Sequence, residues 1–360
     1  MKRKLTILTI LVVLVIVVLA WRTLTAAGVF TALANGPDLD CTRIPGAPGA
    51  EDMVLDRAKG LVYVSSFDRR KARQGSAKGA LYRFSLEDPA GTLTDITPTT
   101  LKRFAPHGIS LYTAPGGVQT LYVVNHATTL SEATDLVGRG QVVEVFTLVP
   151  GKAAQHRKTV SDPSFVSLND VQAVDENRFY VTNDHGSEPG RVRVFEEFAL
   201  LGLANVVYFD GAGVRTVASG LTYANGLALS PGGATLYVTE TTGRALLSYA
   251  VEDETGALKL TRRLPLAFGL DNIDVDSSGM LWITGHPKLY DFVAHAADGA
   301  HPSPSQVVTV TLTPSGEAAV DTRFMDKGTL LSGASIAVAD QGKMFVGSVF
   351  EADFLVCDLS

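Results

Sequence analysis

The sequence feature that most constrains the fold is a pattern that recurs six times along the chain. In each copy an apolar, alternating segment and a polar turn precede a second segment, in which an aromatic residue is followed by Val or Ile. The aromatic residues are Tyr63, Tyr122, Tyr180, Tyr237, Trp282 and Phe345. Alternating segments joined by Asp, Asn, Pro and Gly indicate β-hairpins, and each repeat has room for about four strands. We therefore predict an all-β chain folded as a six-bladed β-propeller. A long sandwich or a two-domain all-β protein is the structural alternative.

Composition and charge exclude several other classes of protein. With 46% hydrophobic and 19% charged residues, the 360-residue chain is too apolar for a disordered protein, and two cysteines are too few for a disulfide-rich mini-domain. Beyond the first 22 residues there are 27 basic and 37 acidic residues. This acidic excess favours cations and disfavours nucleic acid as a partner.

The N-terminal segment has the features of a membrane-targeting sequence. Residues 5–21 contain no charge, and about 25 Å of helix from 17 residues is close to the thickness of a bilayer core. Three basic residues precede this stretch, so the positive-inside rule places the propeller outside the cytoplasm, in a periplasmic or extracellular space. A cleaved signal peptide, which would release a secreted protein, is the alternative. The expected divisions are a cytoplasmic N-terminus (1–4), a transmembrane or signal-anchor helix (5–21), a linker (22–37) and the propeller domain (38–360).

A second candidate membrane contact lies inside the propeller. Residues 191–204 break the strand pattern and predict a short helix that exposes Phe195, Phe198, Leu200 and Leu201. An apolar helix surface of this kind can cover one face of the propeller or enter a membrane surface. The membrane is therefore an expected partner, through the N-terminal helix and through this segment.

The two cysteines bracket the exported domain. Cys41 lies near its start and Cys357 lies near its end. Outside the cytoplasm such a pair favours a disulfide that joins the two ends of the domain, as closure of a propeller requires. Two buried free thiols are the alternative.

Six polar residues occupy the same place in the six repeats. Aligned on the aromatic residues, the first strands begin near Glu51, His107, Asn169, Asn225, Asn272 and Ser335. The inner strands of a propeller run along its central channel, so these residues should form a ring around the axis. Burying them without partners would cost a few kcal/mol each. One carboxylate, three amides and the adjacent Asp271 offer oxygen ligands with two negative charges, which suits Ca²⁺ better than Zn²⁺ or Mg²⁺. Asp52 and Asp170, which follow two of them, predict a second ion, and turn capping is the alternative reading of the asparagines.

These same segments resemble one known family. GAEDMVLD, APHGISLY, LYVVNH, SLNDVQAV, FYVTNDH, YANGLALSP, LDNIDVD, LWITGHP and VCDL are similar, in the same order, to the paraoxonase/arylesterase family. The resemblance extends from about Cys41 to Leu359 and implies a six-bladed propeller with two calcium ions, a disulfide between its ends and a retained N-terminal apolar segment. It also implies hydrolysis of lactones and aryl esters, so the expected partner is a small-molecule lactone or ester substrate.

The resemblance assigns roles by motif. It implies a catalytic Ca²⁺ held by Glu51, Asn169, Asn225, Asp271 and Asn272. It implies a structural Ca²⁺ held by Asp52, Asp170 and the backbone carbonyl of Ile109. The family's histidine pair falls on His107 and His126. The charged stretch 67–71 departs from the family, whose animal members have an apolar and aromatic pocket edge there.

Chemistry places the histidines at the centre of the mechanism. Hydrolysis of a lactone needs a base that activates water near neutral pH, and His107 in the ring is the candidate, with His126 orienting it or relaying the proton. Asp271 as a nucleophile is the rival assignment. His286, Ser335 and Tyr223 are expected in the pocket wall. A sugar-lactone hydrolase of the gluconolactonase type and a non-catalytic, calcium-stabilised propeller that binds a partner are the alternative functions.

Overall fold

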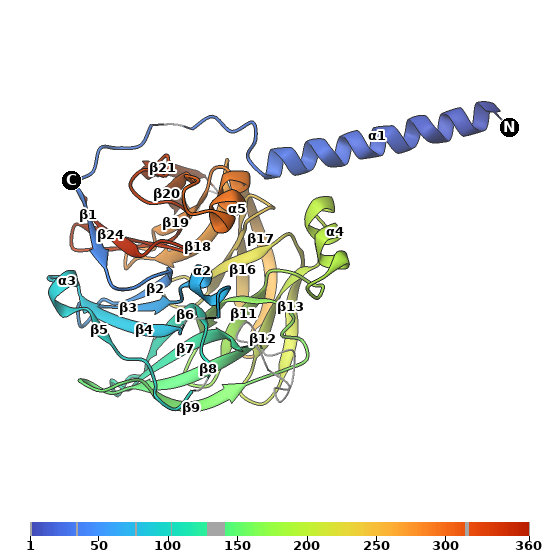
Figure 1. Ribbon diagram of the computed structural model, residues 1–360. Helices are drawn as coiled ribbons and strands as arrows, with labels where there is room; N and C mark the ends of the chain where they lie inside the picture. The colour runs from blue at the N-terminus through green and yellow to red at the C-terminus, as the bar shows by residue number, and fades with distance from the viewer. Residues whose placement is uncertain are drawn as a thin grey trace.

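The computed structural model describes residues 2–33, 35–75, 78–101, 103–127, 141–313 and 317–359. Its strands form six antiparallel sheets of four strands, arranged around a common axis (Figure 1). The predicted six-bladed propeller is therefore confirmed. The first strand of each sheet lies innermost, because these six strands contact one another in a closed circle.

The blades follow the chain in order. From inner to outer strand, the first three are β2 (Ala50–Asp56), β3 (Leu61–Ser66), β4 (Ala80–Ser85) and β5 (Thr94–Asp95); β6 (Pro106–Thr113), β7 (Gln119–His126), β8 (Gln141–Leu148) and β9 (Gln155–Val160); β10 (Leu168–Ala173), β11 (Phe179–Asn183), β12 (Ala204–Phe209) and β13 (Val214–Leu221). The next two are β14 (Ala224–Leu229), β15 (Thr235–Glu240), β16 (Ala245–Glu252) and β17 (Ala257–Pro265); β18 (Gly269–Val275), β19 (Leu281–His286), β20 (Ser305–Leu312) and β21 (Ala318–Asp326). The last is β22 (Ala334–Asp340), β23 (Lys343–Ser348), β24 (Asp353–Asp358) and β1 (Cys41–Pro45).

The repeated aromatic residues belong to the packing between blades. Tyr122, Tyr180 and Phe345 are at most 1% exposed, and each lies in an apolar cluster that spans neighbouring blades. Tyr237 differs from them in remaining half-buried. The recurring pattern therefore marks residues that pack between neighbouring sheets.

The last blade is completed by the first strand. β1 pairs antiparallel with β24, which places Cys41 opposite Cys357, and the two are joined by a disulfide across 316 residues of sequence. The expected disulfide between the ends of the domain is confirmed. One strand from each end of the domain therefore closes the ring of blades.

Loss of this disulfide should weaken the propeller. We expect Cys41→Ala/Cys357→Ala to lower the free energy of unfolding by about 2–4 kcal/mol, because the long closed loop no longer restricts the unfolded chain. Urea denaturation with and without reductant measures the effect. An unchanged midpoint in the variant would show that pairing of β1 with β24 closes the ring without help from the bond.

All six inner strands share one irregularity. In each, the register with the second strand shifts near the start of the strand, between Ala50 and Asp52 in β2 and at matching places in the others. The residues within the shifts are Glu51; His107 and Gly108; Asn169 and Asp170; Asn225 and Gly226; Asp271 and Asn272; and Ser335. Bulges of this kind redirect side chains, so every member of the predicted ring lies where its strand departs from regular pairing.

The inner strands of adjacent blades approach one another closely beside this ring. A Cβ atom on Gly108 would lie 2.4 Å from the Asp170 carboxylate, and one on Gly226 would lie 2.8 Å from the Cα atom of Asn272. Only glycine permits such contacts, which bring the ring side chains of adjacent blades together.

The N-terminal helix projects away from the propeller. The stretch from Arg3 to Ala26 within α1 (Lys2–Ala26) includes an 18-residue window with a mean hydropathy of 2.7 and no buried residue, so the helix is long and apolar enough to cross a membrane (Figure 1). Its C-terminal end contacts the propeller, where the Thr23 hydroxyl donates a hydrogen bond of 2.6 Å to the carbonyl of Phe198. This helix could serve as a signal anchor.

The described part of the chain has four further helices: α2 (Arg69–Ala72), α3 (Pro89–Thr92), α4 (Arg191–Ala199) and α5 (Leu289–Ala297). The prediction of one helix over 191–204 was too long. Leu200 adopts φ 50°, a left-handed conformation that ends α4 after Ala199, and β12 begins at Ala204. Phe195 and Phe198 are exposed as expected, but Leu200 and Leu201 are partly buried.

Candidate functional site

Two cavities lie along the propeller axis. A pocket of about 410 Å³ opens at the end where the inner strands begin, and the ring residues Glu51, Asn169, Asn225 and Asp271 form part of its wall. A smaller cavity of about 100 Å³ lies further along the same strands. The residues predicted for two metal ions thus lie at two successive levels of one channel.

The upper level is a set of buried side chains, four of which have an oxygen atom without a hydrogen-bond partner. Its five members are at most 5% exposed: Glu51, Asn169, Asn225, Asp271 and Asn272. One carboxylate oxygen of Glu51 and the side-chain oxygens of all three asparagines have no hydrogen-bond partner. Buried acceptors are normally satisfied, so four unsatisfied oxygens in one place form a site that could hold a cation.

Hydrogen bonds orient the three amides. Asn225 donates through Nδ2 to the Thr241 hydroxyl at 3.0 Å, and Asn272 donates to the Glu51 carboxylate at 3.0 Å. Asn169 Nδ2 lies 3.4 Å from the Asp184 carboxylate. With each amide nitrogen engaged, the amide oxygens are free for a ligand.

The donor set fits calcium. It comprises oxygen atoms only and carries two negative charges, which a divalent, hard cation with several oxygen ligands would balance. Among the residues that the structure describes, no three His, Cys, Asp or Glu side chains gather closely enough to hold a metal by themselves, so the amide oxygens are essential to such a site. A zinc-type cluster of His and Cys is not part of this arrangement.

Side-chain hydroxyl groups from neighbouring blades donate hydrogen bonds to backbone carbonyls at the upper level. Thr182 donates to the carbonyl of Asn225 at 2.7 Å, and Thr239 donates to the carbonyl of Asp271 at 2.6 Å. Ser335, a member of the predicted ring, donates to the carbonyl of Glu51 at 2.6 Å and is fully buried, and it does not line the pocket as we expected. Each of these three bonds links one inner strand to a neighbouring blade.

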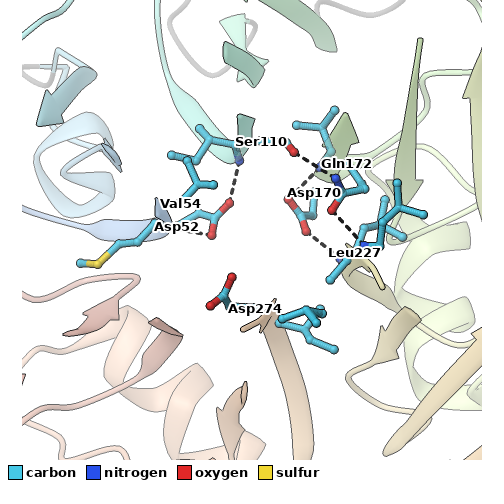
Figure 2. Close-up of a pocket in the computed structure, with 14 residues that line it drawn as sticks. Asp52, Val54, Ser110, Asp170, Gln172, Leu227 and Asp274 are labelled. Atoms are coloured by element: carbon cyan, nitrogen blue, oxygen red, sulfur yellow. Dashed lines mark hydrogen bonds between the residues drawn. The ribbon is translucent and has the colours of Figure 1, made fainter. Parts of the chain in front are cut away.

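The lower level centres on two aspartates held by backbone amides. The N–H of Ile109 donates to Asp52 at 2.6 Å, and the N–H of Leu227 donates to Asp170 at 2.7 Å. Figure 2 shows Asp52, Asp170 and Asp274 pointing into the cavity from different inner strands. Burial raises the pKa of Asp170 to about 7 against the opposing effect of the Leu227 N–H, as expected for a carboxylate crowded near others without a cation.

Asp274 was missed by the sequence analysis. It forms an ion pair with Arg57, whose Nη2 lies 2.6 Å from its carboxylate. The signal was present, because residues two apart on a strand share a face and Asp274 follows the ring residue Asn272 at that spacing.

The two predicted histidines lie together beside the ring. The ring centroids of His107 and His126 are 4.8 Å apart. His107 Nδ1 is 3.3 Å from the Glu51 carboxylate, and His126 Nε2 is 2.7 Å from the carbonyl of Leu168, to which it donates. Burial lowers the pKa of both imidazoles, which keeps them neutral and able to accept a proton near pH 7.

Other pocket residues frame the ring. His286 Nε2 lies 2.9 Å from the Asp271 carboxylate, and the imidazole stacks on Phe292 of α5 at 3.9 Å. Tyr223, with a φ of 57°, also lines the pocket and packs edge-on against His185. His286 and Tyr223 therefore occupy the pocket wall, while α5 supplies its apolar side with Leu289, Phe292 and Val293.

Arg69 is a pocket residue that we did not predict from the sequence. From the start of α2 its guanidinium reaches the ring, with Nη2 2.5 Å from His107 Nδ1. Burial raises the pKa of Glu51 to about 8, and the positive charge of Arg69 is the main influence that opposes this rise.

The fold and this site define a class: six-bladed propellers with a buried ring of oxygen ligands at the base of an axial pocket. The family model described as Arylesterase matches residues 71–359. Serum paraoxonase/arylesterase 1 of Rattus norvegicus is 31% identical over 335 residues, which cover 89% of each chain. The chain therefore belongs to the paraoxonase/arylesterase family.

Solved structures with little sequence similarity share the fold. A gluconolactonase from Xanthomonas campestris aligns with a TM-score of 0.53 at 17% identity, covering 92% of this chain and 94% of the other. A calcium-binding regucalcin from Agrobacterium tumefaciens aligns with a TM-score of 0.53 at 13% identity, covering 91% and 98%. These likenesses concern the propeller alone.

Proposed function

We propose that the chain is a calcium-dependent hydrolase that opens lactones and cleaves aryl esters in the axial pocket. Membership of the arylesterase family supports an esterase or lactonase. The observation that carries the calcium dependence is the set of four unsatisfied buried oxygens on Glu51, Asn169, Asn225 and Asn272.

Two ions complete the channel in this proposal. The upper Ca²⁺ is held by Glu51, Asn169, Asn225, Asp271 and Asn272. The lower, structural Ca²⁺ is held by Asp52, Asp170 and the carbonyl of Ile109, with Asp274 nearby in the same cavity. When bound, the upper ion supplies a Lewis acid that polarises the substrate carbonyl and stabilises the developing oxyanion.

His107 removes the proton from the attacking water. Its Nδ1 lies 3.3 Å from the Glu51 carboxylate and so faces the ring. Because Arg69 donates a hydrogen bond to this nitrogen, we assign the tautomer of the neutral imidazole that has its lone pair on Nδ1. His126, fixed by the carbonyl of Leu168, orients His107 and relays the proton. We assign the base to His107 and not to Asp271, because Asp271 already accepts a hydrogen bond from His286 and is needed as a ligand.

The test compares turnover of γ- and δ-lactones, phenyl acetate and gluconolactone by the full-length chain in detergent, with Ca²⁺ and after chelation. Calcium-dependent turnover of lactones or phenyl acetate supports the proposal. Turnover restricted to gluconolactone would favour a sugar-lactone hydrolase. Calcium binding without any turnover would favour a propeller that uses the ion only for its fold.

The pH profile should reflect a depressed histidine. Burial, then Arg69 and His126, place the pKa of His107 well below its ordinary 6.5, and only the neutral imidazole accepts a proton. At saturating Ca²⁺ we expect kcat/KM to stay level as the pH falls from 8 to 6.5 and to decline only below that. An acid limb centred at or above pH 6.5 would argue against His107 as the base.

For the setting of the enzyme, we propose that residues 5–21 anchor the propeller (38–360) to a membrane, outside the cytoplasm, with 1–4 inside and 22–37 as the linker. Contact between α1 and the exposed phenyl groups of α4 supports this arrangement, because both then offer apolar surface on the same side. Reaction of a cysteine introduced near residue 3 with an impermeant reagent, before and after lysis, tests the orientation.

A further inference from the structure

Arg69 presents a fixed positive charge inside the substrate pocket. Its Nη1 donates to the carbonyls of Phe67 and Val349, both at 3.3 Å, and its Nη2 lies against Nδ1 of His107. These contacts from two sides of the pocket hold the planar guanidinium in one orientation.

Once a divalent cation is bound, the carboxylates of the pocket have partners other than Arg69. Of the described residues that line the pocket, Arg69 is the one Lys or Arg, and Glu51, Asp271 and Glu197 are the carboxylates. A bound Ca²⁺ balances Glu51 and Asp271. Glu197 lies 3.1 Å from Nε2 of His185.

His185 carries the charge that Glu197 needs. Burial lowers the pKa of His185, but hydrogen bonds to Asp184 and Glu197 outweigh that effect and raise the pKa to about 9. The protonated imidazole serves both Asp184, at 2.7 Å, and Glu197. Among the described residues, the hydrogen-bond partners of Arg69 are uncharged: the carbonyls of Phe67 and Val349 and the imidazole of His107.

We propose that Arg69 binds a carboxylate of the substrate, so that lactones and esters bearing a negative charge near the scissile carbonyl are preferred. This inference rests on the proposed hydrolase function. A guanidinium has five N–H donors and the three contacts above leave at least two for a ligand, and its planar fork matches a carboxylate. The apolar side of the pocket, from α5, takes the remainder of the substrate.

A carboxylate on Arg69 also changes the surroundings of the base. In the structure Arg69 Nη2 occupies the lone-pair side of His107 Nδ1, where the proton from water has to arrive. A substrate carboxylate that takes over the guanidinium draws this donor away from His107. Recognition of the charged group and release of the base are then one event.

The experiment uses a matched pair of substrates with the calcium-loaded, full-length protein: 5-oxotetrahydrofuran-2-carboxylate and its carboxamide. We expect kcat/KM to favour the carboxylate roughly 10- to 100-fold, as loss of one charged hydrogen-bonded contact implies. Arg69→Gln should bring the ratio of the two kcat/KM values to about 1, whatever its effect on the rate of either substrate alone, and Arg69→Lys should keep part of the preference. Arg73→Gln, in the next turn of the same segment with its guanidinium on the carbonyl of Ala296, is the control.

A second readout does not depend on turnover. Calorimetry measures binding of tetrahydrofuran-2-carboxylate and of its carboxamide, neither of which can be hydrolysed as an ester, to wild type and Arg69→Gln. Preference for the anion that disappears in the variant supports the proposal even if no lactone is turned over, in which case only the hydrolase function fails. Equal binding of both compounds by wild type, or an equal loss of both in a folded Arg69→Gln, would overturn it and leave Arg69 a structural contact of His107.

Discussion

Replacement of His107 by glutamine should lower kcat for lactone hydrolysis about 10²- to 10⁴-fold, the range that removal of a general base produces. Glutamine is similar in size and cannot take a proton, while its amide can still approach Glu51 and Arg69 as the imidazole does. The fold and calcium affinity should therefore persist, and the loss should fall on kcat more than on KM. Steady-state kinetics at saturating Ca²⁺, with a thermal melt of each variant, measures both.

The matched control is His301→Gln. His301 is partly exposed, contacts Asp291 through its side chain and does not line the pocket, so its replacement should leave kcat unchanged within about twofold. If His107→Gln retained more than a tenth of the wild-type kcat, the base would have to be sought elsewhere, with Asp271 the first candidate.

Calcium should stabilise the propeller more at high pH than at low pH. Burial raises the pKa of Glu51 to about 8 and that of Asp170 to about 7, from ordinary values of 4.5 and 3.8. In the metal-free protein, protons on these groups stabilise the fold below their ordinary pKa, and this contribution is lost as the pH rises through 7 and 8. A bound cation replaces the protons, so we expect a larger rise in Tm on adding Ca²⁺ at pH 8.5 than at pH 5.5.

The size of the effect follows from mass action. At 100 times its dissociation constant, an ion bound only by the folded state adds about 2.7 kcal/mol to the free energy of unfolding. Differential scanning calorimetry of metal-free protein, titrated with Ca²⁺ at both pH values, measures it, and Mg²⁺ at equal ionic strength is the control. A rise that is the same at both pH values, or equally large with Mg²⁺, would contradict the assignment of the ring as a calcium site.

Much of the architecture was predictable because it is repeated. A hairpin pattern that recurs six times has few ways to bury all its apolar faces, and Tyr122, Tyr180 and Phe345 pack between blades as the pattern indicates. The ring was predictable for a related reason. Polar residues at one position of every inner strand must meet on the axis, whichever residue type each blade supplies.

Features that occur once were not predictable in the same way. Arg69 reaches the pocket because α2 lies beside the ring. Its Nη1 donates a hydrogen bond to the carbonyl of Val349, a residue near the other end of the chain. Such a contact between distant segments has no local signature, and a charged stretch is typical of an exposed loop. The end of α4 depended on a left-handed Leu200, a conformation that leucine seldom adopts and that sequence does not announce.

Completion of the last blade by β1, the first strand of the domain, also sets an order of events during synthesis. Cys41 leaves the ribosome early, yet its partner Cys357 follows 316 residues later, roughly 15 to 60 s at ordinary rates of translation. Through that interval β1 has no sheet to join, and its thiol has no other cysteine of the same chain to pair with, because the sequence contains only two. With two cysteines, the chain cannot form a non-native disulfide within itself. The non-native disulfide that it can still form joins two nascent chains before the sixth blade is complete.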